Sequence, residues 1–278
     1  VMLSRRIFLS LPTLWAASAS AREPSPSTPP AAVPGSTLAR HAARYRVDAT
    51  ILLLGIPLLS RTSVGSGYAS VEELPAAISL QFAAGSLPER ARGLNRLGFI
   101  QELHSPSSSR YFGFMTSSGE ESFAEARHAL EEPGAAESPY TAIAGTVGGG
   151  SARSRACRFL FPARLSWAHW DQILPAARAA FDQSSPSQPE TLLACPPDLC
   201  SSFLATLHHA IQSRAPLSDY PFVYGTRRLT LRAALSPERK SGLLRLDGKT
   251  LNGKKTLSTF RLWLQPGNSV PRRIELQP

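Results

Sequence analysis

The chain has few cysteine, methionine and histidine residues, which are common nucleophiles, bases or metal ligands. Among 278 residues there are three cysteines, two methionines and six histidines. The sequence contains no G-x-S-x-G nucleophile elbow, no H-E-x-x-H zinc-binding helix, no phosphate-binding loop and no dinucleotide-binding glycine motif. These absences exclude the enzyme classes that such motifs mark. We therefore expect no catalytic motif, no cofactor and no metal, and we favour a non-enzymatic protein.

Long apolar runs are also missing, so we predict no transmembrane span in the mature chain. The longest candidate, residues 7–17, is too short for a bilayer, which needs ~20 predominantly apolar residues. It follows Arg5 and Arg6 and contains Phe8 and Leu9 near its start. It leads into a stretch of small residues in which Ala19 and Ala21 fit an A-x-A cleavage site. This is typical of a signal peptide over residues 1–21, of the twin-arginine or the general secretory type. We expect a bacterial protein that is periplasmic or secreted.

Residues 22–37 are rich in proline and serine and have no periodicity, which predicts an extended linker. The remaining residues, 38–278, are sufficient for one folded α+β domain, and a hydrophobic content of 42% allows a real core. The expected organisation is a signal peptide, a linker and a single domain.

Lysine is scarce, yet the chain is strongly basic because it is rich in arginine. The formal net charge is +10, and removal of residues 1–21 takes away only Arg5 and Arg6. Such a charge suits contact with an anionic envelope surface. The arginines are scattered along the chain and not clustered on one stripe, however, so we favour codon usage in a GC-rich genome as their explanation. Export argues against nucleic acid as a partner.

Two of the three cysteines are close in sequence. Cys195 and Cys200 enclose four residues, and in an oxidising compartment they could form a disulfide. Two alternatives stay open, namely free thiols and a metal site that adds His208 and His209, although that spacing matches no standard zinc pattern. Cys157 lies in an apolar run and is expected to be a buried strand residue.

Alternating polar and apolar residues predict many strands. The clearest lie in the C-terminal third, where residues 227–235 alternate without interruption and Asn252-Gly253 is a hairpin signal that predicts a type I′ turn. Helical spacing with capping residues predicts helices in the middle of the chain. Strands are expected at 44–54, 65–73, 78–83, 99–103, 110–116, 140–147, 156–161, 227–235, 243–251, 256–264 and 272–277, and helices at 87–93, 120–132, 167–181 and 199–214.

These elements predict an α+β fold. We expect a twisted, curved antiparallel sheet, a half-barrel-like meander, with a helical insertion packing on its apolar face. Such a sheet can hold an acyl chain between itself and the helices, although the same face could also be a filled core.

Catalytic candidates are few. His169 lies beside Asp171 between tryptophans, and these two with Glu102 could form an acid–base group in a cleft. The alternative for His169 and Asp171 is the first turn of an amphipathic helix.

Two stretches of the sequence together resemble a known set of proteins. One runs from Tyr45-Arg46-Val47-Asp48 through Leu54-Gly55-Ile56-Pro57 to Gly67-Tyr68, and the other from Phe260-Arg261-Leu262-Trp263-Leu264 to Arg272-Arg273-Ile274-Glu275-Leu276. They resemble a set of uncharacterised exported bacterial envelope proteins, a domain of unknown function. The resemblance covers about a third of the chain and implies a curved antiparallel sheet similar to lipoprotein-carrier half-barrels. The predicted helical middle, 167–214, departs from that pattern, and the resemblance assigns no functional residues.

Three functions follow from these features. The first is a non-enzymatic periplasmic protein that binds an apolar or lipid-like envelope component. The second is a cell-envelope hydrolase acting on a glycan or an ester. The third is a structural or interaction protein that uses a basic sheet face containing Arg228 and Arg232.

Overall fold

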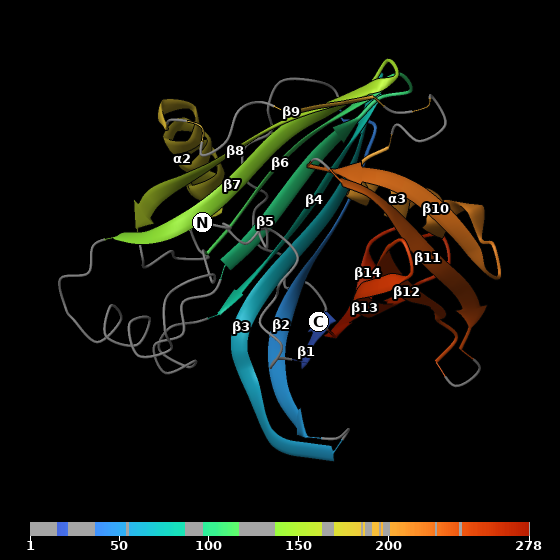
Figure 1. The fold of residues 1–278 in the computed structure, drawn as a ribbon. Coiled ribbons are helices and arrows are strands. Elements are labelled where there is room, and N and C mark those ends of the chain that lie inside the picture. The colour runs from blue at the N-terminus through green and yellow to red at the C-terminus, as the bar shows by residue number, and fades with distance from the viewer. Residues whose placement is uncertain are drawn as a thin grey trace.

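The described part of the chain forms one continuous antiparallel sheet of fourteen strands with two helices packed against it (Figure 1). The computed structural model describes residues 16–21, 37–53, 56–86, 97–116, 137–162, 170–184, 186, 191–194, 196, 201–225, 227–238 and 241–277. The predicted curved α+β fold is confirmed. The elements are β1 (Ala16–Ala21), β2 (Ala39–Leu53), β3 (Ile56–Leu74), β4 (Ala77–Ser86), β5 (Leu97–His104), β6 (Ser108–Thr116), β7 (Glu137–Gly148), β8 (Ser151–Pro162), α2 (Trp170–Gln183), β9 (Thr191–Ala194), α3 (Phe203–Ser213), β10 (Ser218–Tyr224), β11 (Arg227–Pro237), β12 (Leu244–Asn252), β13 (Lys255–Leu264) and β14 (Pro271–Gln277).

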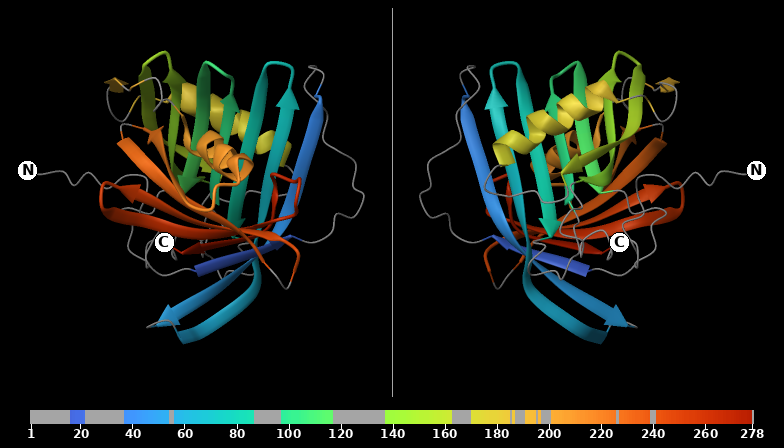
Figure 2. Two further views of the ribbon diagram at one scale, coloured as in Figure 1. Left: turned by 90° about the vertical axis from the view of Figure 1, so that its right-hand side faces the viewer. Right: turned by 90° about the vertical axis from the view of Figure 1, so that its left-hand side faces the viewer.

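The sheet is a long meander with one break in chain order. Its strands run in the order β10-β11-β12-β13-β14-β1-β2-β3-β4-β5-β6-β7-β8-β9, so the C-terminal strands join the N-terminal ones through β1. Strands β9 and β10 are its two edges. The two side views show that the sheet curves around α3 (Figure 2).

The two faces of the curved sheet carry different apolar clusters. We call the face that contacts α3 the inner face, and it carries a core that includes Val71, Leu80, Leu231 and Leu262. The outer face contacts α2, and aromatic side chains gather there. This second cluster contains Phe99, Phe112, Phe114, Tyr140, Phe159 and Phe181. The helical insertion thus covers both faces of the sheet.

The C-terminal meander shows the predicted alternation. In β11, Leu229, Leu231 and Ala233 are buried while Arg228 and Arg232 are not. One detail of the prediction is wrong, because the hairpin turn between β12 and β13 has Gly253 and not Asn252 as its first central residue. Asn252 pairs with Lys255, and Gly253 has a φ of 56°. Glycine at the first central position is the hallmark of a type II′ turn, not of type I′.

The long hairpin β2–β3 contains the predicted irregularity at its glycines. The register shifts between Val47 and Ala49, opposite a segment that begins after Arg61 and ends at Gly65. A Cβ at Gly65 would lie 2.2 Å from the carbonyl oxygen of Gly85 on β4. Only glycine allows this close approach of the two strands.

Strands β1, β9 and β10 differ from the sequence prediction, which contains no strand at their positions. Strand β9 is short, and β10 contains Pro221, which has no backbone N–H to donate to a ladder. Both are edge strands, where proline is tolerated because one side has no ladder. Strand β1 lies within the segment predicted as a signal peptide. The predicted helices at 87–93 and 120–132 and most of the linker lie outside the described residues.

Candidate functional site

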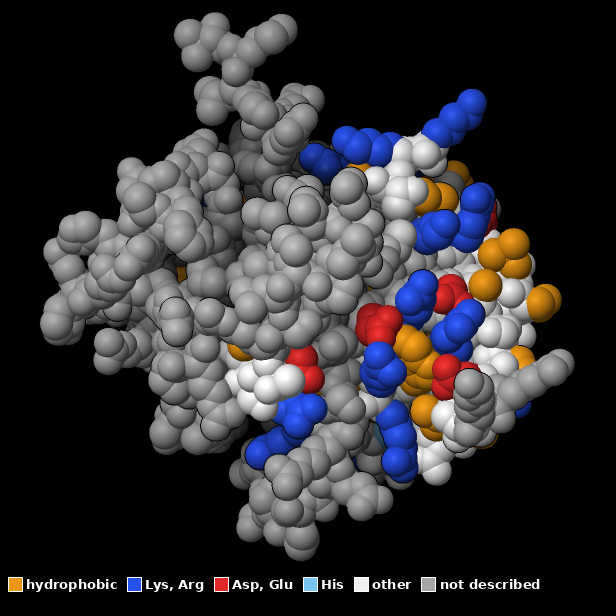
Figure 3. Space-filling view, turned by 90° about the horizontal axis from the view of Figure 1, so that it is seen from below, with side chains coloured by type: hydrophobic (Ala, Val, Ile, Leu, Met, Phe, Trp, Pro, Cys, Tyr) orange, Lys and Arg blue, Asp and Glu red, His pale blue; other side chains and the backbone are white. Residues whose placement is uncertain are grey.

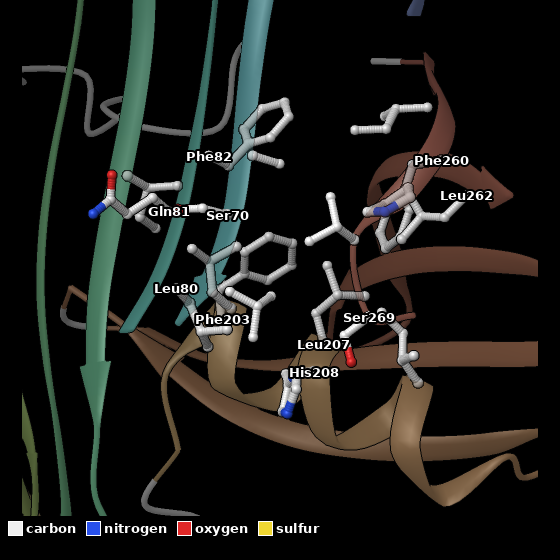
Figure 4. A pocket seen from close by; sticks show the side chains of 18 of the residues that line it. Ser70, Leu80, Gln81, Phe82, Phe203, Leu207, His208, Phe260, Leu262 and Ser269 are labelled. Atoms are coloured by element: carbon white, nitrogen blue, oxygen red, sulfur yellow. The ribbon is translucent and has the colours of Figure 1, made fainter. Parts of the chain in front are cut away.

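A pocket of about 140 Å³ lies between the inner face of the sheet, helix α3 and the strands β13 and β14 (Figure 4). Its walls are almost entirely apolar, and it is partly open to the outside. Six of the apolar lining side chains that Figure 4 labels come from three directions, from β4, from α3 and from β13. They are Leu80 and Phe82, Phe203 and Leu207, and Phe260 and Leu262.

Helix α3 forms the pocket wall because it presents two faces. Ala205 and Ala210 are buried against the core of the inner face. Phe203, Leu207 and Ile211, which share the helical spacing predicted from the sequence, are only partly buried. Large apolar side chains that border a core yet remain partly exposed indicate open space beside them. The apolar face is therefore a packed core that contains a pocket.

A carboxylate from the sheet fixes the start of α3. Glu102 on β5 is 0% exposed, and its Oε1 accepts a hydrogen bond of 2.8 Å from the amide of Leu204. Its Oε2 accepts one of 2.8 Å from the amide of Ala205 and one of 2.6 Å from the hydroxyl of Ser202. The first amides of a helix have no partner within the helix, and an anion near them is stabilised by the helix dipole. Glu102 thus acts as a cap supplied from another element.

Glu102 is therefore buried against the first residues of α3 and does not line an open cleft. Burial raises the pKa of its carboxyl group, whereas the hydrogen bonds from α3 and from Ser202 lower it. Every hydrogen-bonding group that faces the carboxylate is a donor, so the ionised form satisfies the site best. Ser202 precedes the helix but makes no side-chain cap of its own, because its hydroxyl serves Glu102.

Two histidines lie close to the pocket. His208 on α3 is part of the pocket lining, and its Nδ1 is buried without a hydrogen-bond partner within the described residues. Burial, followed by the proximity of His104 and His209, lowers the pKa of His208, while Glu73 acts in the opposite direction. The pKa of His104 is also lowered, chiefly by burial, and its Nδ1 lies 2.8 Å from the hydroxyl oxygen of Ser109. Both rings are therefore neutral at neutral pH.

Two tyrosines, Tyr111 on β6 and Tyr224 at the end of β10, pack against each other. The rings of Tyr111 and Tyr224 stack with centroids 5.5 Å apart. The hydroxyl of Tyr111 accepts a hydrogen bond of 3.1 Å from the amide of Gly225, and burial raises its pKa to about 12. Nearby, the amide of Val223 donates to the carbonyl of Ser201 over 2.8 Å. The Tyr111 contacts attach β6 to the end of β10, and the Val223 bond attaches β10 to the residues just before α3.

The structure places the remaining predicted site residues as follows. His169, Cys195, Cys200 and the signal residues Arg5, Arg6, Phe8 and Leu9 lie outside the described residues. The backbone of Asp171 lies in the first turn of α2. Cys157 is buried on β8, as predicted, and is a free thiol. Among the residues named as catalytic candidates, only Glu102 has its side chain within the described residues. The acid–base group with His169 and Asp171 stays a prediction.

The basic outer face of the C-terminal strands is largely paired with acids. Arg261 reaches both Asp247, at 3.2 Å, and Glu275, at 3.5 Å, and these three are direct cross-strand neighbours. Arg232 holds Asp219 through two hydrogen bonds of 2.7 Å, and Arg228 donates to the carbonyl of Ala194. Figure 3 shows blue and red side chains interspersed on the right of the face seen from below. This face is charged but not uniformly positive.

Neither a metal centre nor a spanning helix occurs in the described ranges. No group of three or more His, Cys, Asp or Glu residues there could hold a metal ion. No helix among the residues that the structure describes is both long and apolar enough to cross a membrane. The pocket beside α3 is the candidate site that we consider in this part of the chain.

Comparisons with known proteins do not name this site. No protein-family model matches the chain, and neither a curated protein nor a solved structure matches it. The resemblance to exported envelope proteins stays a prediction.

Proposed function

We propose that this chain binds an apolar, lipid-like ligand by taking a hydrocarbon segment into the pocket between α3 and the inner face of the sheet. The pocket itself is the observation that carries the proposal. Its walls offer the ligand side chains of Phe, Leu, Val and Ile from three separate parts of the fold.

The size and chemistry of the pocket suit a hydrocarbon segment. An apolar cavity of about 150 Å³ stays dry and accepts benzene in an engineered protein. A pocket of about 140 Å³ with such walls is comparable, and it is partly open. A short length of an acyl chain can fill it while the rest of the molecule lies outside. Burial of apolar surface stabilises such a complex by ~25 cal/mol for each Å² removed from water.

The polar groups around the pocket lie at its margin and suit an amphiphile. Figure 4 shows the nitrogens of His208 and the hydroxyl of Ser269 toward the lower edge of the lining. Ser269 already accepts a hydrogen bond of 2.7 Å from Gln212. Gln81 borders the pocket through its strand, but its amide points away. The ligand's polar end would therefore lie outside, beside the margin.

The predicted export signal and the basic charge support an envelope ligand. A periplasmic or secreted protein meets lipids of the cell envelope, and the net positive charge that remains after removal of Arg5 and Arg6 favours approach to anionic head groups. No catalytic group is needed for such a role. The hydrolase and the basic-face interaction protein stay predictions, and no contact in the described residues favours them over ligand binding.

The test begins with the protein purified after export from a bacterial host. Native mass spectrometry should detect co-purifying lipid, and a fluorescent fatty-acid probe should bind with a stoichiometry of one. Leu207→Trp should fill the pocket and weaken probe binding at least tenfold. The matched control is Leu217→Trp, since Leu217 is 63% exposed and lies outside the pocket lining.

A second variant tests the same position in case Leu207→Trp does not fold. Leu207→Asn keeps a branched side chain of four heavy atoms and places an amide in the apolar wall, so it should also weaken probe binding without filling the space. The denaturation midpoint of each variant shows whether it is folded. Undiminished probe binding by folded Leu207→Trp and Leu207→Asn, or no binding by the unaltered protein, would contradict the proposal.

A further inference from the structure

Strand β1 occupies a central slot in the sheet, between β14 and β2. It is antiparallel to both, with Ala17 opposite Leu276 and Ala49, and Ala19 opposite Ile274 and Val47. Ile274 and Leu276 also belong to the pocket lining. The six residues of β1 therefore complete the sheet where it forms one wall of the pocket.

The same six residues include the end of the apolar run and the cleavage site, Ala19 and Ala21, of the predicted signal peptide. Cleavage after Ala21 is hydrolysis of the peptide bond to Arg22, in which water gives a carboxylate on Ala21 and a free amine on Arg22. The product that starts at Arg22 no longer contains β1. Formation of this strand in cis and removal of residues 1–21 therefore exclude each other.

The new N-terminal segment is unsuited to take the place of β1. Residues 22–36 contain five prolines, Pro24, Pro26, Pro29, Pro30 and Pro34. Proline cannot donate to a ladder, and a central strand needs donors on both of its sides. No replacement strand is available from this neighbouring part of the chain.

One side-chain hydrogen bond runs directly from β2 to β14. The hydroxyl of Tyr45 on β2 donates a hydrogen bond of 2.6 Å to the carbonyl oxygen of Pro271 on β14. Tyr45 is 4% exposed and is part of the core of the inner face, so its position is fixed. The two strands joined by this bond flank β1 and run parallel to each other.

Direct pairing of β14 with β2 is also unfavourable in the register set by β1. Glu275 and Asp48 are both opposite Ser18, and Arg273 and Arg46 are both opposite Ser20. Closure in that register would bring like charges together, which destabilises a strand pair. Open strand edges are sites that accept an extended segment from another chain.

We propose that β14 and β2 form a strand-acceptor site in the processed protein. Its partner is an extended, proline-free segment of another exported polypeptide, bound antiparallel to both strands. Small residues at alternate positions of that segment match Ala17 and Ala19, which β1 places between Ile274 and Val47 and their neighbours. This site does not depend on lipid binding in the pocket.

The experiment uses the exported protein and first determines its N-terminus by mass spectrometry. A fluorescent peptide with the sequence of residues 15–22 then serves as the probe. The control peptide carries Ala19→Pro, which removes one backbone donor and leaves the other residues unchanged. We expect an N-terminus at Arg22, saturable binding of the probe, and binding of the control at least tenfold weaker.

Hydrogen exchange locates the bound peptide. The probe should slow exchange of backbone amides in β14 and β2, whereas the proline peptide should not. An N-terminus upstream of Ala16 would overturn the proposal, because β1 would then fill the slot in cis. Absence of probe binding, or equal binding of the two peptides, would overturn it as well. Lipid binding measured on the same sample separates this result from the proposed function.

Discussion

The hydroxyl of Ser202 donates a hydrogen bond of 2.6 Å to the buried carboxylate of Glu102, across one hundred residues of sequence. The same carboxylate accepts from the amides of Leu204 and Ala205. The bond therefore links the helix that walls the pocket to the middle of the sheet. Loss of this carboxylate should affect both stability and ligand binding.

We predict that Glu102→Ala lowers the free energy of unfolding by about 3 kcal/mol, since it leaves several buried donors without a partner. Glu102→Gln should cost less, because its amide oxygen can still accept while its NH₂ group cannot. Chemical denaturation measures both. Asp219→Asn, which breaks the exposed ion pair with Arg232, is the control and should change stability little. A loss equal to that of the control would contradict the capping role of Glu102.

The histidines beside the pocket predict a pH dependence of stability. The pKa values of His104 and His208 lie below the ordinary 6.5. In the unfolded chain these rings bind protons near pH 6.5, whereas in the folded protein they stay neutral to lower pH. The unfolded state then binds more protons, so stability falls as the pH falls through 6.5. Denaturation midpoints at pH 7.5 and 5.5 measure this.

His208→Gln should flatten that dependence by removing one of the two groups. His41→Gln is a control outside α3, on an exposed position of β2. Asp219 and Glu238 have lowered carboxyl pKa values, so their contributions are lost only at more acidic pH. A slope between pH 7.5 and 5.5 that is the same in the unaltered protein and in His208→Gln would refute the assignment.

The C-terminal meander could be predicted from the sequence because the information is local. Each apolar residue of β11 is two positions from the next, and the glycine of the β12–β13 turn lies between two alternating runs. The turn type was predicted wrongly because Asn252-Gly253 is compatible with more than one register. The choice between registers depends on pairing along both strands, which the turn residues alone do not specify.

The site could be predicted only in part. Phe203, Leu207 and Ile211 were assigned to one helix face from their spacing, and that face borders the pocket. The start of α3 at Phe203 could not be predicted, because its cap is Glu102 on a distant strand. Strand β10 was missed because Pro221 argues against a central strand, and the sequence does not show that β10 is an edge.

The bond between Tyr45 and Pro271 predicts a specific loss of stability. Tyr45→Phe keeps the ring in the core but leaves the buried carbonyl of Pro271 without its donor. We expect a loss of ~1–2 kcal/mol in the free energy of unfolding. Tyr68→Phe is the matched control, because its hydroxyl contacts Arg40 at the surface. Equal losses for the two variants would argue against a bridge between β2 and β14.

The cysteines can be assigned by thiol counting. Cys157 is 0% exposed, and burial raises the pKa of its thiol, so both access and thiolate formation are suppressed. We expect no alkylation of Cys157 in the folded protein and full alkylation after unfolding. If Cys195 and Cys200 form the predicted disulfide, the unfolded, unreduced protein shows one reactive thiol, and it shows three if they are free. Rapid alkylation of Cys157 in the native state would contradict its burial.

Gly248 on β12 controls the position of Phe260, which is part of the pocket lining. The ring of Phe260 lies over this glycine, and a Cβ there would approach three of its ring carbons to 2.3–2.8 Å. Gly248→Ala must therefore displace the ring and change the shape of the pocket. We expect a loss of about 1–3 kcal/mol from overpacking, together with weaker fatty-acid probe binding. Gly98→Ala is the control, because a Cβ at Gly98 meets nothing within 4 Å. If folded Gly248→Ala bound the probe as tightly as Gly98→Ala does, Phe260 would not form part of the binding surface.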